Sequence, residues 1–379
     1  MRTWAEINLD AIKYNFNSVK SKTDSKVMAI IKADAYGHGV KEVAQLLQKE
    51  GAYAFGVATA DEALELRSLG FKLPVLILGV IFPEEYHSII QNDISFAVAD
   101  VQSASVASAI AGELNKNALV HIKLDTGMGR IGFPCNEKSL WEIKDISQMD
   151  NIDIQGVFSH MSKADEKDKT YADMQFEKFM NMCDSLEKAG IRIPIKHIAN
   201  SASIATLPHT HLDMVRSGIV TYGLNPSEDV NENHISLKPA MTLKSRITHV
   251  KIMEEDGAIS YGGHYIAKKG QKIATVAIGY ADGFSRVLSG KTKVIVNGHF
   301  APVVGNICMD QCMIDASHIE NIKIGDEVII FGSDGNNTVS VDSVALLCGT
   351  INYEIVCRVT KRVPRVYIQN NKIIALDNY

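Results

Sequence analysis

The chain has 379 residues, 46% of them hydrophobic and 22% charged, and a formal net charge of −5. This length fits one large barrel with a second domain, or two domains of ordinary size, and no apolar run approaches the roughly 20 residues that span a bilayer. Acidic and basic residues are mixed along the chain, so no basic stripe is available to bind nucleic acid or anionic lipid. The start of the chain shows no export signal, which makes the cytoplasm the expected location.

Eight short apolar runs rich in β-branched residues recur through the first two-thirds of the chain. Each run has the length of a strand, and segments with helical spacing and glycine stops lie between them. Near-continuous apolar strands that alternate with helices indicate a parallel sheet, and eight of them favour a closed (β/α)8 TIM-type barrel over an open doubly wound sheet. The runs are residues 26–32, 53–59, 74–80, 94–100, 119–126, 152–160, 195–200 and 213–223.

The sequence pattern changes after about residue 233. Alternating apolar and polar segments now follow one another, separated by Gly, Asn and Asp turns, with few helical patterns between them. Residues 223–239 are the most loop-like connection. We therefore expect a barrel at residues 1–233 and a mainly β C-terminal domain at residues 234–379.

The six cysteines show neither a CxxC pair nor the Cys/His spacing of a zinc site. A disulfide framework and a bound metal are therefore not expected. The cysteines read as free thiols in a reducing compartment.

Residues able to do chemistry collect where the barrel strands are expected to end, and in such barrels the active site lies at the C-terminal ends of the strands. A serine at the end of the seventh strand and a glycine beside the eighth fall where barrels commonly bind a phosphate group. A phosphorylated ligand therefore fits, and the lysine that ends the first strand could bond to it covalently. The set is Lys32, Tyr36, Lys123, Asp125, Arg130, His160, Asn200, Ser201, Arg216, Gly218 and Ile219.

Each of these residues also has an ordinary structural explanation when it is taken alone. A lysine at a strand end is usually solvated, and a single histidine is more often hydrogen-bonded structure than a catalyst. Arg216 could pair with Asp213, and Lys123 and Arg130 could lie on the surface. Their joint occurrence at one end of one barrel favours function, but it does not identify a reaction.

The phrase IIKADAYGHG, residues 30–39, resembles the cofactor-lysine motif of the alanine racemases, which have a pyridoxal phosphate barrel followed by a β domain. Further matches run in the order of the family and cover both domains: HIKLDTGMGRIGF, SHMSKADE, IANSAS, VRSGIVTYGL, SYGGHY, AIGYADG, GNICMDQ and GTINYE. Asn306, in GNICMDQ, stands where the family often has arginine, and no role is assigned to it.

The resemblance implies a site for pyridoxal 5'-phosphate. Lys32 would hold the cofactor as an imine, because a primary amine can form and exchange a Schiff base with the aldehyde. His160 would pack against the pyridine ring, and Arg216 would face the ring nitrogen and leave it unprotonated, which should suppress transamination. The phosphate would be held by Tyr36, Ser201, Tyr353 and the backbone amides of Gly218 and Ile219.

The resemblance also implies that the enzyme interconverts L-alanine and D-alanine, with one base on each face of Cα. Lys32 would serve one face, and Tyr261 from the other subunit of a head-to-tail homodimer would serve the other. Arg130 would orient the substrate or the phenolic oxygen of the cofactor, and Lys123 is the position that relatives often carbamylate, which would hold Arg130 in place. Met309 would come from the partner subunit, and Tyr280 and Asp310 would lie near the entrance or just behind the contacting residues.

Several alternatives stay open on the sequence alone. A racemase of serine, or of a broader range of amino acids, is the nearest one, because a pocket discriminates a single small substituent by only about 1–3 kcal/mol. A barrel-plus-β-domain amino-acid decarboxylase would be expected to place an acidic residue near the ring nitrogen, where this chain has Arg216. A non-catalytic pyridoxal phosphate carrier would leave the segments SYGGHY and GNICMD without a role. The resemblance also implies that the enzyme supplies D-alanine for peptidoglycan.

Overall fold

The computed structural model describes residues 1–231 and 233–377. Glu232, in the expected connection, and the last two residues of the expected second domain lie outside the described residues. The chain divides into two compact units, and each is described by itself. Unit 1 comprises Met1–Ala11, Tyr36–Gly39 and Pro239–Tyr379, and unit 2 comprises Ile12–Ala35 and Val40–Lys238.

Unit 2 is a closed parallel β/α barrel. Its strands follow the order β10-β2-β3-β4-β5-β6-β8-β9, and every pair along this path is parallel. The amides of Asp213 and Arg216 donate to the carbonyls of Lys196 and Ala199 at 3.2 and 3.1 Å, which joins the last strand to the first. Each of the eight predicted runs contains one of these strands, so the expected (β/α)8 barrel is confirmed. The strands are β2 (Lys26–Ile30), β3 (Ala54–Val57), β4 (Val75–Ile77), β5 (Ser95–Val98), β6 (Ala118–Asp125), β8 (Ile152–Phe158), β9 (Lys196–His197) and β10 (Met214–Ser217), and β7 (Phe133–Pro134) pairs with β6.

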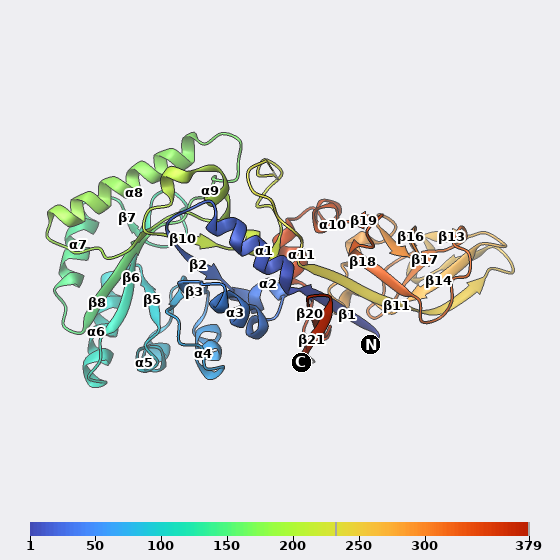
Figure 1. Ribbon diagram of the computed structural model, residues 1–379, viewed down its shortest axis with the longest axis horizontal. Coiled ribbons are helices and arrows are strands. Elements are labelled where there is room, and N and C mark those ends of the chain that lie inside the picture. The colour runs from blue at the N-terminus through green and yellow to red at the C-terminus, as the bar shows by residue number, and fades with distance from the viewer. Residues whose placement is uncertain (232, 378–379) are drawn as a thin grey trace. The chain divides into compact units, whose positions relative to one another are not determined.

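The helices of unit 2 cover the outside of the barrel, as Figure 1 shows for α3 to α8. Several begin directly after a strand with a side chain that accepts from their own first turn; Asn200, for example, accepts from the Ser203 amide at 3.0 Å. Such caps fix the strand-to-helix turns on which the expected site lies. The helices are α1 (Leu9–Lys20), α2 (Lys32–Gly37), α3 (Val40–Lys49), α4 (Ala60–Ser68), α5 (Pro83–Gln91), α6 (Val101–Glu113), α7 (Glu137–Ser147), α8 (Thr170–Lys188), α9 (Ser201–Thr206), η1 (Pro208–Thr210) and η2 (Ile219–Tyr222).

Unit 1 is built on a ten-stranded sheet, and the expected mainly β C-terminal domain is confirmed. Strands β11, β14, β17, β16, β15 and β18 close on themselves, because β18 also pairs with β11. The elements are β1 (Thr3–Asn8), β11 (Met241–Ile252), β12 (Gly257–Ile259), η3 (Tyr261–Gly263), β13 (Tyr265–Ala267), β14 (Lys272–Val276), η4 (Tyr280–Asp282), η5 (Arg286–Leu288), β15 (Lys293–Val296), β16 (His299–Val304), β17 (Cys312–Asp315), β18 (Glu327–Ser333), β19 (Thr338–Val339), α10 (Val341–Cys348), α11 (Asn352–Cys357), β20 (Arg365–Gln369) and β21 (Lys372–Asp377).

The first strand of the chain belongs to the sheet of unit 1. Strand β1 pairs antiparallel with β11 and parallel with β20. The expected barrel domain, residues 1–233, includes β1, whereas this pairing places β1 among strands more than 200 residues further along the chain. Its side chains Trp4, Ala5 and Ile7 are buried there.

The chain turns with the opposite hand directly after Lys32. Residues 33–36 have φ angles of 52–54°, so α2 is a left-handed helical turn. Such a turn costs roughly 1–2 kcal/mol for each non-glycine residue and needs support from its surroundings. The Ala33 amide donates to Glu62 Oε1 at 2.7 Å, and Asp34 Oδ1 accepts from the Val40 amide at 2.7 Å. Gly37, with φ of 77°, follows at a point where a Cβ atom would lie 2.4 Å from the Val356 carbonyl oxygen.

Candidate active site

The expected site residues of unit 2 lie on the C-terminal parts of barrel strands or on the segments that follow them. Lys32 comes two residues after β2, and His160 comes two residues after β8. Ser201 begins α9, and Ile219 begins η2 directly after β10. The common edge that the sequence predicted for these residues is therefore present in the barrel.

Arg216, on β10, is the best-fixed of these residues. Its side chain is 4% exposed and donates to the carbonyls of Ser159 and Ile198 at 2.7 and 3.0 Å, and to His197 Nδ1 and His160 Nδ1 at 3.0 and 3.1 Å. Burial lowers the pKa of Arg216 to about 9, which still leaves the guanidinium charged at neutral pH. Asp213, the alternative partner, instead accepts from the Lys196 amide.

A chain of imidazoles continues from Arg216 into the barrel. An arginine can only donate hydrogen bonds, so the Nδ1 atoms of His197 and His160 must both accept. Neutral His197 then carries its proton on Nε2 and donates to His121 Nδ1 at 2.9 Å. Arg216 thus sets the tautomers of His160 and His197, and through His197 that of His121.

These histidines stay neutral over the physiological range of pH. Burial lowers the pKa of His121 to about 3, and burial together with the Arg216 charge lowers the pKa of His197 well below its usual value. The pKa of His160 is also well below its usual value, first through burial and then through the charges of Arg216, Arg130, Lys123 and Lys32. The charges that act on His160 therefore come from four side chains. The His160 imidazole itself is neutral and carries its proton on Nε2.

Lys123 lies inside the barrel rather than on its surface. Its side chain is 2% exposed, and Nζ donates to the Leu124 carbonyl at 2.7 Å. Burial and then the Arg216 charge lower the pKa of Lys123 to about 7. A large fraction of this amine is therefore neutral at pH 7 and able to react as a nucleophile.

Arg130 lies on an exposed loop after β6 that Asp125 organises. Asp125 Oδ1 accepts from the amides of Gly127, Met128 and Gly129 at 3.0–3.1 Å. Burial alone would raise the pKa of Asp125, but these three donors lower it, so the carboxylate stays ionised. Asp125 thus fixes the loop, and Arg130 is free to reach a ligand.

Ser201, Gly218 and Ile219 lie together where two short helices begin. The Gly218 amide donates to Ser201 Oγ at 2.9 Å, and both Ser201 and Ile219 are buried. The Gly218 amide is thus engaged with Ser201 Oγ, the hydroxyl hydrogen of Ser201 is itself a donor, and Ile219 begins a helix whose first amides have no partner within it. This donor set suits a phosphate group, and it fits the cofactor that the sequence implies.

Unit 1 places its expected cofactor-binding tyrosines side by side. The ring centroids of Tyr36 and Tyr353 are 6.2 Å apart, with planes tilted by 50°. Tyr36 follows Lys32 by one left-handed turn, and Tyr353 lies on α11, whose Val356 packs closely on Gly37.

The remaining expected site residues of unit 1, Tyr261, Tyr280, Met309 and Asp310, lie on neighbouring loops. The amides of Tyr280 and Ala281 donate to the carbonyls of Cys308 and Met309 at 3.1 and 3.0 Å. Asp310 accepts from Arg362 at 2.6 Å. The side chains of Tyr261, Met309 and Tyr280 are 72%, 54% and 42% exposed, so unit 1 leaves all three accessible to another surface.

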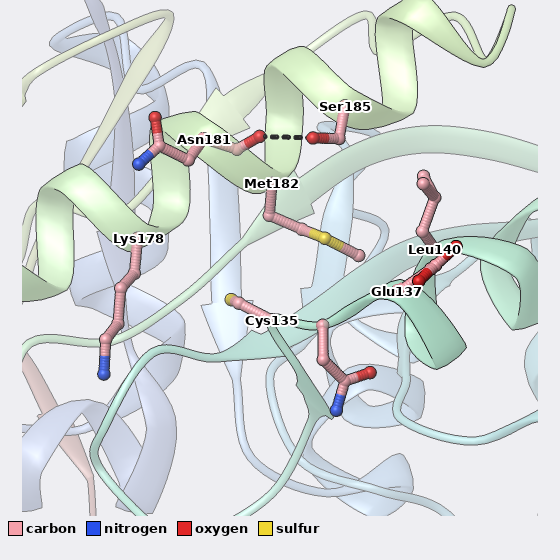
Figure 2. A pocket seen from close by; sticks show the side chains of 8 residues that line it. Cys135, Glu137, Leu140, Lys178, Asn181, Met182 and Ser185 are labelled. Carbon is pink, nitrogen blue, oxygen red and sulfur yellow. Dashed lines mark hydrogen bonds between the residues drawn. The ribbon is translucent and has the colours of Figure 1, made fainter.

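A cavity of about 370 Å³ lies elsewhere, between α7 and α8 on the outside of the barrel. Figure 2 shows Cys135 and Met182 facing this space, with Lys178 and Glu137 at its edges. None of the expected site residues lines it. Burial raises the pKa of the Cys135 thiol, which makes it a poor nucleophile, so we do not regard this cavity as an active site.

Three residues that support the site were not predicted from the sequence. His197 and His121 lie in predicted strands, although His197 accepts a hydrogen bond from Arg216 and donates one to His121. Glu62 was not singled out, although its carboxylate supports the turn after Lys32. The glycines of AYGHG gave a hint of that turn, whereas the strand patterns gave no signal for the histidine pair.

Comparisons with known proteins cover nearly the whole chain. Residues 7–226 match the family described as "Alanine racemase, N-terminal domain", and residues 240–367 match "Alanine racemase, C-terminal domain". The chain is 47% identical over 377 residues to an alanine racemase of Clostridium perfringens, covering 99% of this chain and 98% of that protein.

Solved structures of alanine racemases also match nearly the whole chain. An alanine racemase of Clostridium difficile 630 has a TM-score of 0.95 and 44% identity, covering 100% of this chain and 98% of that one. An alanine racemase of Bacillus anthracis with bound L-Ala-P has a TM-score of 0.95 and 35% identity, with the same coverage. No described helix of this chain is both long and apolar enough to cross a membrane.

Proposed function

The chain belongs to the alanine racemase family, and from this premise we propose that it interconverts L-alanine and D-alanine with pyridoxal 5'-phosphate as its cofactor. The observation that carries the proposal is Arg216, a buried cation at the barrel mouth whose orientation is fixed by two carbonyls and two imidazoles. When bound, the cofactor supplies an aldehyde for amino groups and a ring that withdraws electrons from Cα.

Lys32, Ser201 and the amides of Gly218 and Ile219 hold the cofactor in this proposal, together with Tyr36 and Tyr353. Lys32 would provide the primary amine that holds the aldehyde of the cofactor and that the amine of the substrate would replace. The Ser201 hydroxyl and the first amides of η2 support a phosphate site, and the Gly218 amide would exchange its hydrogen bond to Ser201 Oγ for one to the phosphate. Arg216 would face the ring nitrogen of the bound cofactor, and because its guanidinium stays charged it would leave that nitrogen unprotonated, which would limit side reactions such as transamination.

The proton is exchanged by two bases on opposite faces of Cα. Lys32, freed by the substrate, serves one face, and Tyr261 of the partner subunit serves the other. His160 supports this role of the tyrosine, because Arg216 occupies its Nδ1 and leaves Nε2–H as a donor. A hydrogen bond donated to a phenol oxygen favours its deprotonated, basic form.

A head-to-tail homodimer brings the two bases to one substrate. The exposure of Tyr261, Met309 and Tyr280 supports this assembly, because large side chains on joined loops are typical of an interface that the single chain lacks. In this proposal, the domain at residues 234–379 contributes Tyr261 and Met309 to the active site of the other subunit. Tyr280 and Asp310 line the entrance or support it.

Arg130 binds the substrate carboxylate or the phenolic oxygen of the cofactor, and a carbamylated Lys123 holds it in position. The neutral amine of Lys123 adds to carbon dioxide, which forms an N–C bond and releases a proton. The pKa of about 7 supports this step, since the reactive neutral amine is abundant near neutral pH. The product is an anion beside Arg130, whose charge acts on Lys123.

We place the reaction in the cytoplasm, in the supply of D-alanine for peptidoglycan. None of the six cysteines is assigned to a disulfide in the described residues, in keeping with a reducing compartment. The decarboxylase alternative is disfavoured because the described hydrogen-bond partners of Arg216 include no carboxylate.

The test is to incubate the purified, yellow protein with L-alanine in heavy water and to follow enantiomer composition and Cα deuteration. We expect D-alanine deuterated at Cα, with no loss of carboxylate. Loss of carboxylate would favour the decarboxylase, and exchange without inversion would remove the second base. Absence of any reaction with alanine, followed by turnover of L-serine, would shift the proposal to a serine racemase.

A further inference from the structure

Tyr261, the proposed base of unit 1, is not fixed by packing of its own side chain. It lies on η3 between β12 and β13, and its side chain is 72% exposed. A reacting group must nevertheless be placed closely, since a displacement of about 1 Å can cost on the order of a hundredfold in rate. In the single chain, the position of Tyr261 therefore depends on the backbone that carries it.

The residue before Tyr261 has a backbone conformation that is nearly restricted to glycine. Ser260 has φ of 65° and ψ of −178°. Such a conformation costs about 1–3 kcal/mol and persists where the surroundings over-determine it.

Ser260 and Asn306 form a reciprocal pair of hydrogen bonds around Tyr261. Ser260 Oγ donates to the Asn306 carbonyl at 2.6 Å, and Asn306 Nδ2 donates to the Tyr261 carbonyl at 2.6 Å. The two loops approach closely, since a Cβ atom on Gly305 would lie 2.6 Å from the Ile259 carbonyl oxygen. The loop of Asn306 also carries Met309, so one connection fixes both exposed residues.

We infer that Asn306 and Ser260 are positioning residues for Tyr261, holding its backbone in the orientation that proton transfer requires before the second subunit is engaged. Neither side chain needs to touch the substrate. The inference rests on the proposed function of Tyr261. It also gives a role to Asn306, the position at which this chain departs from the common family pattern.

The test uses the holoenzyme and the Asn306→Ala variant, with Asn337→Ala as a matched control. Asn337 Nδ2 likewise donates to a backbone carbonyl, that of Gly298 at 2.8 Å, in the same unit and away from the expected site. We expect Asn306→Ala to slow Cα exchange by about tenfold for one enantiomer of alanine, the same one that Tyr261→Phe slows, since misplacement of a reacting group lowers the rate. Exchange with the other enantiomer, and both exchanges in Asn337→Ala, should be unchanged.

A second readout does not depend on activity. With 3-fluorotyrosine at position 261, the fluorine resonance of the holoenzyme should be single, and it should broaden or split in Asn306→Ala and in Ser260→Ala. An unchanged spectrum in both variants, or equal slowing with both enantiomers, would overturn the inference. If Tyr261→Phe itself slows both enantiomers equally, the proposed base is wrong, and the fluorine spectrum still decides whether the pair positions Tyr261.

Discussion

The two units hold their functional side chains in opposite ways. In the barrel, Arg216, Lys123 and the histidines are buried, and their side chains make the hydrogen bonds that fix them. In unit 1, Tyr261, Met309 and Tyr280 are exposed, and hydrogen bonds to backbone carbonyls fix the loops that carry them. These barrel side chains are therefore fixed by contacts within the barrel, whereas the three exposed side chains of unit 1 need a further surface to fix their orientation.

The largest expected effect on this comparison is that of a substitution at Lys32, in the barrel. We expect Lys32→Ala to lose the yellow colour and to lower alanine racemisation by more than about 10³-fold, because it removes the covalent bond and a proton transfer that alone contributes roughly 10²–10⁴-fold. Lys26→Ala is the matched control, since Lys26 lies at the other end of the same strand. Racemisation that survives in Lys32→Ala would contradict the proposed role.

A substitution at Tyr261 tests the role of the exposed side chains of unit 1. We expect Tyr261→Phe to lower racemisation by about 10²–10⁴-fold while Cα exchange of one alanine enantiomer with heavy water continues. Tyr265→Phe, on the same hairpin, removes a hydroxyl that accepts from Gln271 and should leave both exchanges near normal. Equal loss of exchange with both enantiomers in Tyr261→Phe would argue against separate bases.

The buried histidines should make the protein sensitive to acid. Burial lowers the pKa of all three on folding, and that of His121 to about 3, so below about pH 6.5 the unfolded chain binds more protons than the folded one and stability falls as pH falls. Each histidine contributes up to about 1.4 kcal/mol per pH unit. Denaturant unfolding from pH 7 to 4 should show His121→Gln, which keeps an acceptor for His197, with a slope smaller by about one proton. A slope equal to that of the unsubstituted protein would mean that His121 is charged in the folded state.

The smallest expected effect is a change in stability, and it tests the left-handed turn after Lys32. Ala33 is exposed with φ of 52°. Ala33→Gly should remove about 1–2 kcal/mol of conformational cost from the folded state. It should also add roughly 0.5–1 kcal/mol to the entropy that the unfolded chain loses on folding. We expect a net stabilisation of up to about 1 kcal/mol in denaturant unfolding. Ala109→Gly, at an exposed position of the right-handed α6, should destabilise by about 1 kcal/mol instead. Two changes of the same sign would refute the left-handed turn.

Much of the barrel could be predicted because it depends on local patterns. Each apolar run is a strand, and parallel strands bring their C-terminal ends to one edge, so Lys32, His160, Ser201 and Arg216 could be grouped from the sequence. The same reasoning misplaced β1, whose partners lie more than 200 residues away. Strand propensity indicates that a segment is a strand but not which sheet receives it.

The finer geometry of the site could not be read from the sequence for a similar reason. His121 and His197 are 76 residues apart, and their hydrogen bond depends on how two non-adjacent strands face the barrel interior. The sign of φ at residues 33–36 also has no periodic signature, since alanine, aspartate and tyrosine are ordinary residues of right-handed helices. Here tertiary contacts, such as the one between Ala33 and Glu62, override local preference.

The left-handed turn has a consequence for which mutations this protein can accept. At φ near 50°, valine, isoleucine and threonine are strongly disfavoured whatever their size or polarity, so positions 33 to 36 have a narrowed set of tolerated substitutions. This restriction applies to residues that need not touch a ligand at all. Sequence variation beside Lys32 should therefore be limited by backbone handedness as well as by chemistry, and a change there can abolish function by reshaping the turn alone.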